Sequence, residues 1–232
     1  MELNLAQLIA VYALPVILAI TLHEAAHGYV AMRFGDLTAY AAGRVTLNPV
    51  RHIDPIGTVL LPLILLALGK IMGGGGVLFG WAKPVPVNFG NLRHPKRDML
   101  WVAAAGPGSN LAMALLWAAV LKTNLAFPET RYALPLALMG AAGIYINVIF
   151  MALNLLPLPP LDGGRILVSL LPHGYALRFA RLERWGFPIL LVLLFTGLLG
   201  AVLWPIIDIT IVGIAQVFGV PVYELVRLGN LF

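Results

Sequence analysis

Two histidines and a glutamate in the run His23-Glu24-Ala25-Ala26-His27 are the most informative residues of this 232-residue chain. On a helix, His23 and His27 stand four positions apart on one face, so both imidazoles can bind the same zinc ion. Glu24 lies beside them and can act as a general base toward a water molecule. These residue types at this spacing indicate metal-assisted hydrolysis.

The motif lies within a long apolar segment. Residues 5–22 carry no charge, and residues 28–32 continue uncharged beyond the motif. The alternative is an ordinary surface helix that matches a five-residue pattern by chance. In lipid that alternative weakens, because ionisable side chains are costly there and an acid such as Glu24 has no structural use that leucine would not serve better. The segment therefore favours hydrolysis of a peptide bond in a membrane-embedded substrate.

The composition is that of an integral membrane protein. Hydrophobic residues make up 60% of the chain and charged residues 11%, whereas soluble domains carry about 25% charged residues. The chain has no cysteine, which excludes disulfides, thiolate zinc ligands and cysteine nucleophiles. The formal charge of +5 does not call for a nucleic-acid partner. The composition instead predicts that the protein lies in the lipid bilayer.

Several apolar segments have about the length of a membrane span, roughly 20 residues. They predict an all-α, polytopic bundle of transmembrane helices in a single membrane-embedded domain, residues 1–232. A small re-entrant element, β or irregular, accompanies the bundle, and Arg44–Leu47 is predicted to be a short strand. The last apolar region has the length of two short spans, with the break at Trp204-Pro205. The predicted spans cover residues 5–32, 99–121, 133–156, 186–204 and 205–220, with a further apolar segment at 56–72.

A zinc site with two histidines needs a third protein ligand. Asp162 has the best context, because Pro157, Pro159 and Pro160 break the preceding helix and Gly163-Gly164 allow close backbone approach. Asp208 is interpreted as an interfacial or interhelical hydrogen-bonding group, with a functional intramembrane acid as the alternative. His52 and Asp54 are interpreted as loop residues. The remaining candidates by residue type are His94 and His173.

Three motifs together resemble the site-2 protease family of intramembrane zinc metalloproteases. They are the His23–His27 motif, Gly106-Pro107-Gly108-Ser109-Asn110, and Asn154-Leu-Leu-Pro-Leu-Pro-Pro-Leu-Asp162-Gly-Gly, in the family's order. The resemblance implies the zinc ligands His23, His27 and Asp162, and Glu24 as catalytic base. It also implies that Asn154 is a polar group near the reacting centre; the alternative for Asn154 is a helix-capping contact. The expected form is a short one without a PDZ domain.

The three motifs also constrain topology. If they meet around one metal, the chain between the first and second motif spans crosses the membrane an even number of times, including zero. We therefore expect residues 56–87 to form a re-entrant hairpin that turns at Gly73–Gly76 and returns through an extended segment.

Basic residues are concentrated on the side of the motifs. By the positive-inside rule this side is cytoplasmic and the N-terminus is outside, in the plasma membrane of a prokaryote. Lys122 and Arg131 lie in the opposite loop. The 11 basic residues on the motif side, of 15 in all, are Arg33, Arg44, Arg51, Lys83, Arg93, Lys96, Arg97, Arg165, Arg178, Arg181 and Arg184.

The function predicted from these observations is an intramembrane zinc metalloprotease whose partner is a membrane protein or peptide with a transmembrane segment. The main alternative is a zinc-binding membrane transporter or sensor without protease activity. A transporter tends to show repeated broken helices in corresponding halves, and the sequence shows none. A structural partner or inactive protease is disfavoured, because every chemical group that catalysis needs is present.

Overall fold

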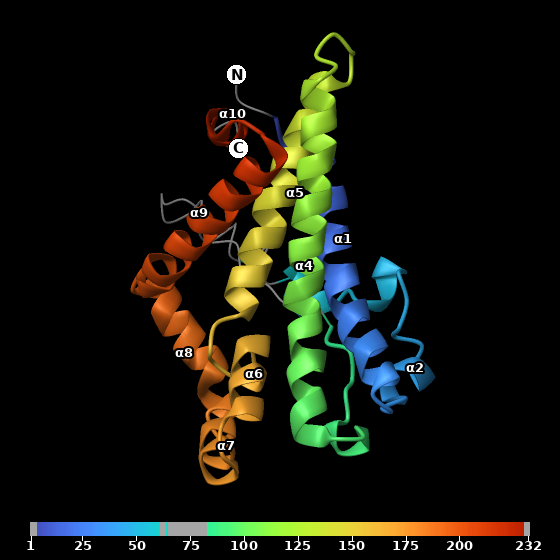
Figure 1. Ribbon diagram of the computed structural model, residues 1–232, viewed down its shortest axis with the longest axis vertical. Helices are drawn as coiled ribbons and strands as arrows, with labels where there is room; N and C mark the ends of the chain where they lie inside the picture. Colours follow the sequence, from blue (N-terminus) through green and yellow to red (C-terminus); the bar gives the residue numbers. More distant parts are fainter. Residues whose placement is uncertain (1–3, 61–63, 65–82, 230–232) are drawn as a thin grey trace.

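The structure is a computed structural model that describes residues 4–60, 64 and 83–229, and it is nearly all helical (Figure 1). Short turns of 3-10 or π geometry occur at η1 (Pro49–Arg51), η2 (Pro55–Leu60) and η3 (Phe89–Asn91). The α-helices are α1 (Leu5–Arg33), α2 (Thr38–Ala41), α4 (Pro95–Leu125), α5 (Ala133–Asn154), α6 (Asp162–Leu170), α7 (His173–Ala180), α8 (Glu183–Phe195), α9 (Leu198–Phe218) and α10 (Val222–Gly229).

Helices α1, α4 and α5 lie side by side and form the centre of the molecule (Figure 1). Four helices in the described ranges, α1, α4, α5 and α9, are long and apolar enough to cross a membrane. This agrees with the predicted all-α membrane protein. Helix α1 begins at a capping box in which Asn4 and Gln7 satisfy each other's backbone amides.

Small residues let α4 and α5 approach closely. A Cβ added at Gly143 of α5 would overlap the indole of Trp117 on α4, and one at Gly140 would touch Leu121. Packing of small residues replaces the hydrophobic driving force that helices lose in lipid. The close contact holds the two helices that carry Asn110 and Asn147 in a fixed register, which matters for the site described below.

The C-terminal helices break at a different place from the one predicted. Helix α8 ends at Phe195 and α9 begins at Leu198, with Gly197 between them in the left-handed conformation at φ 76°. The predicted break at Trp204-Pro205 is wrong, because Pro205 lies inside α9. A proline costs a membrane helix one backbone hydrogen bond, which its neighbours can compensate, whereas the positive φ at Gly197 ends the helical path.

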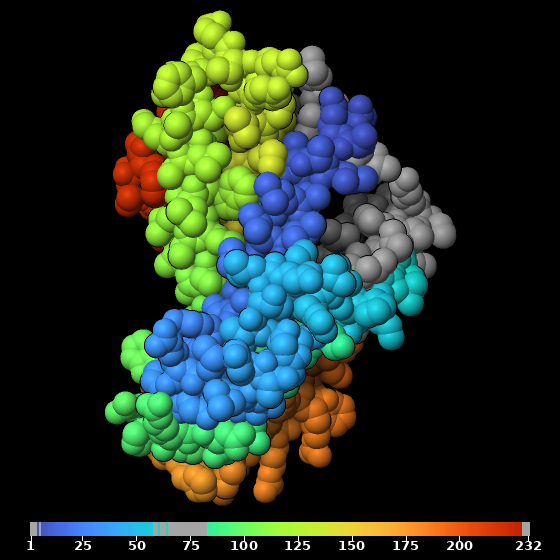
Figure 2. Space-filling model, turned by 90° about the vertical axis from the view of Figure 1, so that its right-hand side faces the viewer, coloured from blue at the N-terminus to red at the C-terminus, as the bar shows by residue number. Residues whose placement is uncertain are grey.

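The predicted strand at Arg44–Leu47 is also wrong, since this segment forms bends and no strand occurs among residues 4–60 and 83–229. The neighbouring extended segment at residues 83–88 does not form a ladder with it. Pro84 and Pro86 lack the amide hydrogens that a ladder needs. On the face seen in Figure 2, the residues that follow α1 (light blue to cyan) cover the surface beside α1.

The chain leaves and returns at one place around the predicted re-entrant hairpin. The amide of Lys83 donates a hydrogen bond to the carbonyl of His52 over 2.9 Å. Most of the hairpin, including Gly73–Gly76, lies outside the described residues. This hydrogen bond places His52 and Lys83 next to each other, and the hairpin between them stays a prediction.

Candidate metal centre

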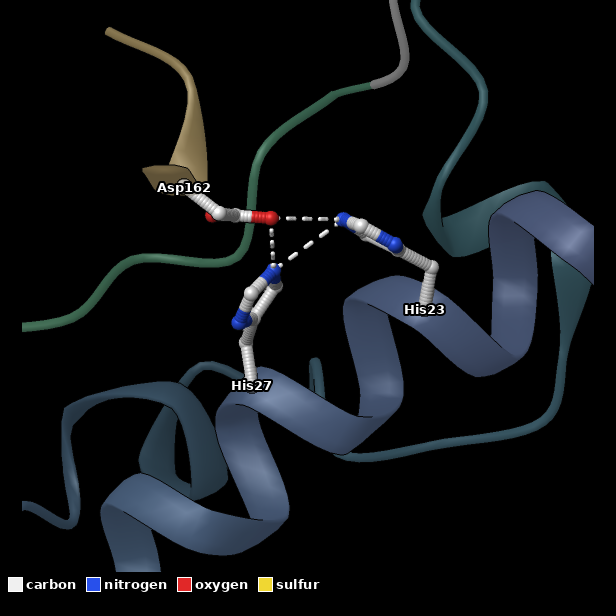
Figure 3. Close-up of side chains that lie close together, drawn as sticks. All are labelled: His23, His27 and Asp162. Atoms are coloured by element: carbon white, nitrogen blue, oxygen red, sulfur yellow. Dashed lines mark hydrogen bonds and ion pairs between the residues drawn. The ribbon is translucent and has the colours of Figure 1, made fainter. Parts of the chain in front are cut away.

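Three side chains from two distant parts of the sequence converge in the interior of the protein. His23 and His27 project from one face of α1, and Asp162 is the first residue of α6 (Figure 3). Their exposed fractions are 7%, 8% and 5%. They form the one group of three or more metal-ligating side chains found in the described part of the chain.

The local sequence after α5 explains how Asp162 reaches α1. Helix α5 ends at Asn154, and the proline-rich turn that follows redirects the chain into α6. A Cβ at Gly163 or Gly164 would overlap the backbone of residues 155–159. The two glycines therefore let the start of α6 pack onto the turn, as the sequence predicted, and this packing fixes the Asp162 carboxylate.

The three ligand atoms are spaced as a zinc ion requires. Nε2 of His23 and Nε2 of His27 each lie 3.2 Å from Oδ2 of Asp162, and the two nitrogens lie 3.1 Å apart. Ligand atoms of a tetrahedral zinc site stand roughly 3.3 Å from one another. Two nitrogens and one oxygen leave a fourth position for water, which is the donor set of a catalytic zinc site.

Each imidazole uses its Nδ1 atom in a hydrogen bond, which leaves the lone pair of Nε2 available to a metal. Nδ1 of His27 lies 2.7 Å from the carbonyl oxygen of Val102, which can only accept, so Nδ1 carries the proton. Nδ1 of His23 lies 2.6 Å from Oδ1 of Asn110. With protons on both Nδ1 atoms, three lone pairs face one another across the centre. Oδ2 of Asp162 is buried and accepts no hydrogen bond from the residues that the structure describes, so a cation is the partner that these atoms fit.

Gly106 provides the space beside the ligands. A Cβ at this position would lie 2.6 Å from Nε2 of His23 and closer still to Nε2 of His27. Any side chain on α4 here would enter the volume between the two imidazoles. The Gly106–Asn110 motif therefore serves the site twice, with a glycine that leaves room and an asparagine that contacts His23.

Glu24 is half-buried on α1, next to the ligands in sequence, and it contacts an extended segment from elsewhere in the chain. Its Oε2 accepts a hydrogen bond from the backbone amide of Val85 over 2.8 Å. We call residues 83–88 the arm. Nη2 of the buried Arg44 donates to the carbonyls of Lys83 and Pro84 over 2.9 and 3.2 Å, which holds the arm in place.

The far end of the arm is held by Asp36, a fully buried carboxylate after α1. It accepts hydrogen bonds from the amide of Asn88 and from the Asn91 side chain, over 2.7 and 3.2 Å, and also from Thr38. Burial raises the pKa of Asp36, but these hydrogen bonds outweigh it and leave the pKa below its ordinary value. The charged form of Asp36 is thereby the one that secures the arm.

Asn154 does not contact the three ligands. It is the last residue of α5, is half-buried, and its Nδ2 donates to the carbonyl of Phe150 over 3.0 Å. This is the helix-end contact that the sequence left open as the alternative. A role near the reacting centre stays a prediction.

The other candidate ligands lie apart from the centre. Nε2 of His52 pairs with the carbonyl of Thr46, and Asp54 accepts the amides at the start of η2. His94 directly precedes α4, and His173 is the first residue of α7. Asp208 is exposed on α9.

Sequence reasoning placed Asn110 in a motif without giving it a role, and it missed the supporting roles of Asn147, the Val85 backbone and Arg44. For Asn110 and Asn147 a signal existed, since each is an amide inside an apolar helix, where an unpaired polar group is costly. For the Val85 amide no signal existed, because every residue except proline carries one.

Comparisons with known proteins agree with this geometry. The profile described as "Peptidase family M50" matches residues 125–197, which include Asn154 and Asp162. The chain is 39% identical over 195 residues to "Putative zinc metalloprotease YwhC" of Bacillus subtilis (strain 168), covering 83% of each protein. It is 32% identical over 180 residues to "Putative zinc metalloprotease Rip2" of Mycolicibacterium smegmatis, covering 78% of this chain and 64% of that protein. No solved structure matches.

Proposed function

The chain belongs to peptidase family M50, the zinc metalloproteases of site-2 protease type, and on that basis we propose that it hydrolyses peptide bonds in or near transmembrane segments of membrane proteins. The observation that carries the proposal is the position of the ligands. His23 and His27 lie on α1, a helix apolar enough to span a membrane, so the centre faces substrates that are themselves in the bilayer. Residues 1–232 act as one metalloprotease domain.

The chemistry divides between the metal and Glu24. His23, His27 and Asp162 would hold a zinc ion, which would supply a Lewis acid that lowers the pKa of water to about 7 and polarises a carbonyl. The Glu24 carboxylate accepts the proton from the attacking water and delivers it to the leaving amine. Asn154 donates a hydrogen bond to the substrate backbone or to the developing oxyanion.

The substrate must present an extended segment to these groups. A transmembrane helix hides its carbonyls in hydrogen bonds to its own amides, so the scissile region has to unwind before attack. If this region of the substrate pairs with the arm, it must bind backbone amides and carbonyls of the arm that are not already hydrogen-bonded. Pro84 and Pro86 carry no amide hydrogen, and Arg44 already occupies the carbonyls of Lys83 and Pro84.

The protein is proposed to lie in the plasma membrane of a prokaryote with the centre toward the cytoplasm and the N-terminus outside. The support is the excess of basic residues at the end of the bundle where His27 and Asp162 lie.

The experiment that tests the function separates catalysis from metal binding. Glu24→Gln keeps the ligands and should retain zinc, while cleavage of a membrane substrate should fall by a factor of about 10² to 10⁴, because one proton-transfer group is lost. Asp162→Ala should lose zinc and cleavage together. Substrates are found as membrane proteins that accumulate with Glu24→Gln but not with the wild type. Unchanged cleavage by Glu24→Gln would refute the mechanism.

The same variant addresses the alternative of a zinc transporter or sensor. Glu24 is not one of the three ligands, so a protein that only moves or senses zinc would keep its zinc-dependent function in Glu24→Gln. Metal accumulation in cells that express each protein measures this. A zinc phenotype that persists in Glu24→Gln without any proteolysis would favour the alternative.

A further inference from the structure

We propose that two buried amides, Asn147 and Asn110, form a directional hydrogen-bond relay that fixes the tautomer of His23 and so presents its Nε2 to the metal. The inference rests on the zinc site of the proposed function. It assigns a positioning role to two residues that contact neither the metal nor the substrate.

The relay joins three helices through the centre of the protein. Oδ1 of Asn110 on α4 lies 2.6 Å from Nδ1 of His23 on α1. Nδ2 of Asn110 donates to Oδ1 of Asn147 on α5 over 3.0 Å and, more weakly, to the carbonyl of Ala19 on α1 over 3.4 Å. Nδ2 of Asn147 donates to the carbonyl of Gly143 over 2.8 Å. Asn110 and Asn147 are both 0% exposed. Two buried amides in apolar helices are costly unless they are paired, and here they are paired with each other.

The direction of the relay follows from its last member. The carbonyl of Gly143 can only accept, so the NH2 group of Asn147 must face it and Oδ1 of Asn147 must face Asn110. That oxygen in turn requires the NH2 group of Asn110, which leaves Oδ1 of Asn110 to face His23. An acceptor at this position requires a proton on Nδ1 of His23. The lone pair of His23 is therefore on Nε2, toward His27 and Asp162.

The reversed relay shows why direction matters. With Asn110 turned over, two oxygens would meet at Asn147, and an NH2 group would face Nδ1 of His23. The imidazole would then carry its proton on Nε2, where it blocks the metal. His27 needs no relay, because its Nδ1 pairs with the backbone carbonyl of Val102. The two histidines thus reach the same tautomer by different means, and His23 depends on side chains that a substitution can change.

The first test reads the proton on His23 directly and needs no substitution in the relay. In the zinc-loaded protein with 15N-labelled histidine, the imidazole nitrogens of His23 are assigned by their absence in His23→Gln. We expect Nδ1 to carry the proton and Nε2 to bind the metal. A proton on Nε2 of His23 would overturn the proposal.

The second test measures zinc affinity by competition with a chromophoric chelator, in the Glu24→Gln background. Asn110→Leu removes the acceptor and should weaken zinc binding by about 10- to 100-fold, the usual loss when the partner of a metal-bound histidine is removed. Asn110→Asp keeps an acceptor for His23 but loses the NH2 group that faces Oδ1 of Asn147, so its loss of zinc affinity should be smaller than that of Asn110→Leu. Asn147→Leu leaves the NH2 group of Asn110 only its weaker hydrogen bond to the carbonyl of Ala19, so the zinc affinity of this variant should lie between those of Asn110→Leu and the parent.

The control is Thr21→Val, which changes another buried polar group on α1 whose Oγ1 has no hydrogen-bond partner among the described residues. It should leave the zinc affinity unchanged. Equal affinity in Asn110→Leu and the parent, or an equal loss in Asn110→Asp and Asn110→Leu, would overturn the role of the acceptor. An Asn147→Leu affinity equal to that of the parent would overturn the relay. Because metal binding is measured without proteolysis, these outcomes are separate from failure of the protease function.

Discussion

The backbone amide of Val85 donates a hydrogen bond to Oε2 of Glu24 across 61 positions of sequence. The acid that the motif marks as the catalytic base is thus held by a segment that has no recognisable motif. A carboxylate that accepts one hydrogen bond from the backbone has a fixed orientation and one oxygen left for a water molecule. The arm therefore helps to orient Glu24, and in the proposed mechanism the residues that hold the arm would act on catalysis through it.

Arg44 provides the test of this coupling. Arg44→Ala removes both hydrogen bonds to the carbonyls of Lys83 and Pro84, so the Val85 amide no longer lies at a fixed distance from Glu24. We expect cleavage to fall by up to about 100-fold, the effect of a misplacement of about 1 Å, with zinc content unchanged. Cleavage rate and bound zinc are measured on the same purified sample.

Arg51→Ala is the matched control, because Arg51 is an exposed arginine of the same loop. It should cleave at the wild-type rate. An Arg44→Ala protein that cleaves normally would show that the arm is not needed to orient Glu24, and one that loses zinc would show that Arg44 supports the fold of the centre instead.

Gly106 and Gly108 give a pair of substitutions that differ by two positions on one helix. A Cβ at Gly106 would enter the space between His23 and His27, whereas one at Gly108 meets nothing within 4 Å. Gly106→Ala should therefore abolish zinc binding and cleavage, and an overpacked interior costs about 1–3 kcal/mol of stability besides. Gly108→Ala should leave both unchanged. Metal analysis of the purified proteins decides between them, and full zinc occupancy in Gly106→Ala would contradict the geometry of the centre.

Much of this centre follows from sequence because its chemistry needs rare residue types at fixed spacing. His23 and His27 must lie one helical turn apart, and a carboxylate after a proline break is the group that can reach them. The apolar composition predicts the membrane helices for the same reason, since lipid admits few alternatives. The supporting contacts are different. The carbonyl of Val102 and the amide of Val85 are backbone groups, and their role depends on how helices pack rather than on which side chain they carry.

The helix boundaries also depend on contacts that the local sequence does not reveal. Trp204-Pro205 has the residue type that breaks helices in water, but α9 continues through it. The break falls at Gly197, where backbone conformation decides. The strand predicted at Arg44–Leu47 failed because a strand needs a partner, and the neighbouring arm contains two prolines. Local propensity could not reveal either outcome, since both depend on neighbours that are distant in sequence.

The last prediction concerns the side of the membrane on which the two ends of the hairpin lie. The amide of Lys83 reaches the carbonyl of His52, and the amide of Arg93 reaches the carbonyl of Phe34 just beyond α1. Residue 93 is therefore near the end of α1 that carries His27, and η1, which contains Arg51, packs against α1. Single cysteines at positions 51 and 93 of this cysteine-free chain, probed in intact cells with a membrane-impermeant thiol reagent, should both be protected if that end is cytoplasmic.

A cysteine at position 131 is the control, because Arg131 is exposed and belongs to the connection between α4 and α5, which lies at the opposite end of the bundle from α7 (Figure 1). It should be labelled. Labelling at 51 and 93 with protection at 131 would reverse the orientation and place the centre outside the cytoplasm, while leaving the hairpin intact. Labelling at only one of positions 51 and 93 would require an odd number of crossings between them. His23, His27, Gly106 and Asp162 could not then meet at one end of the bundle.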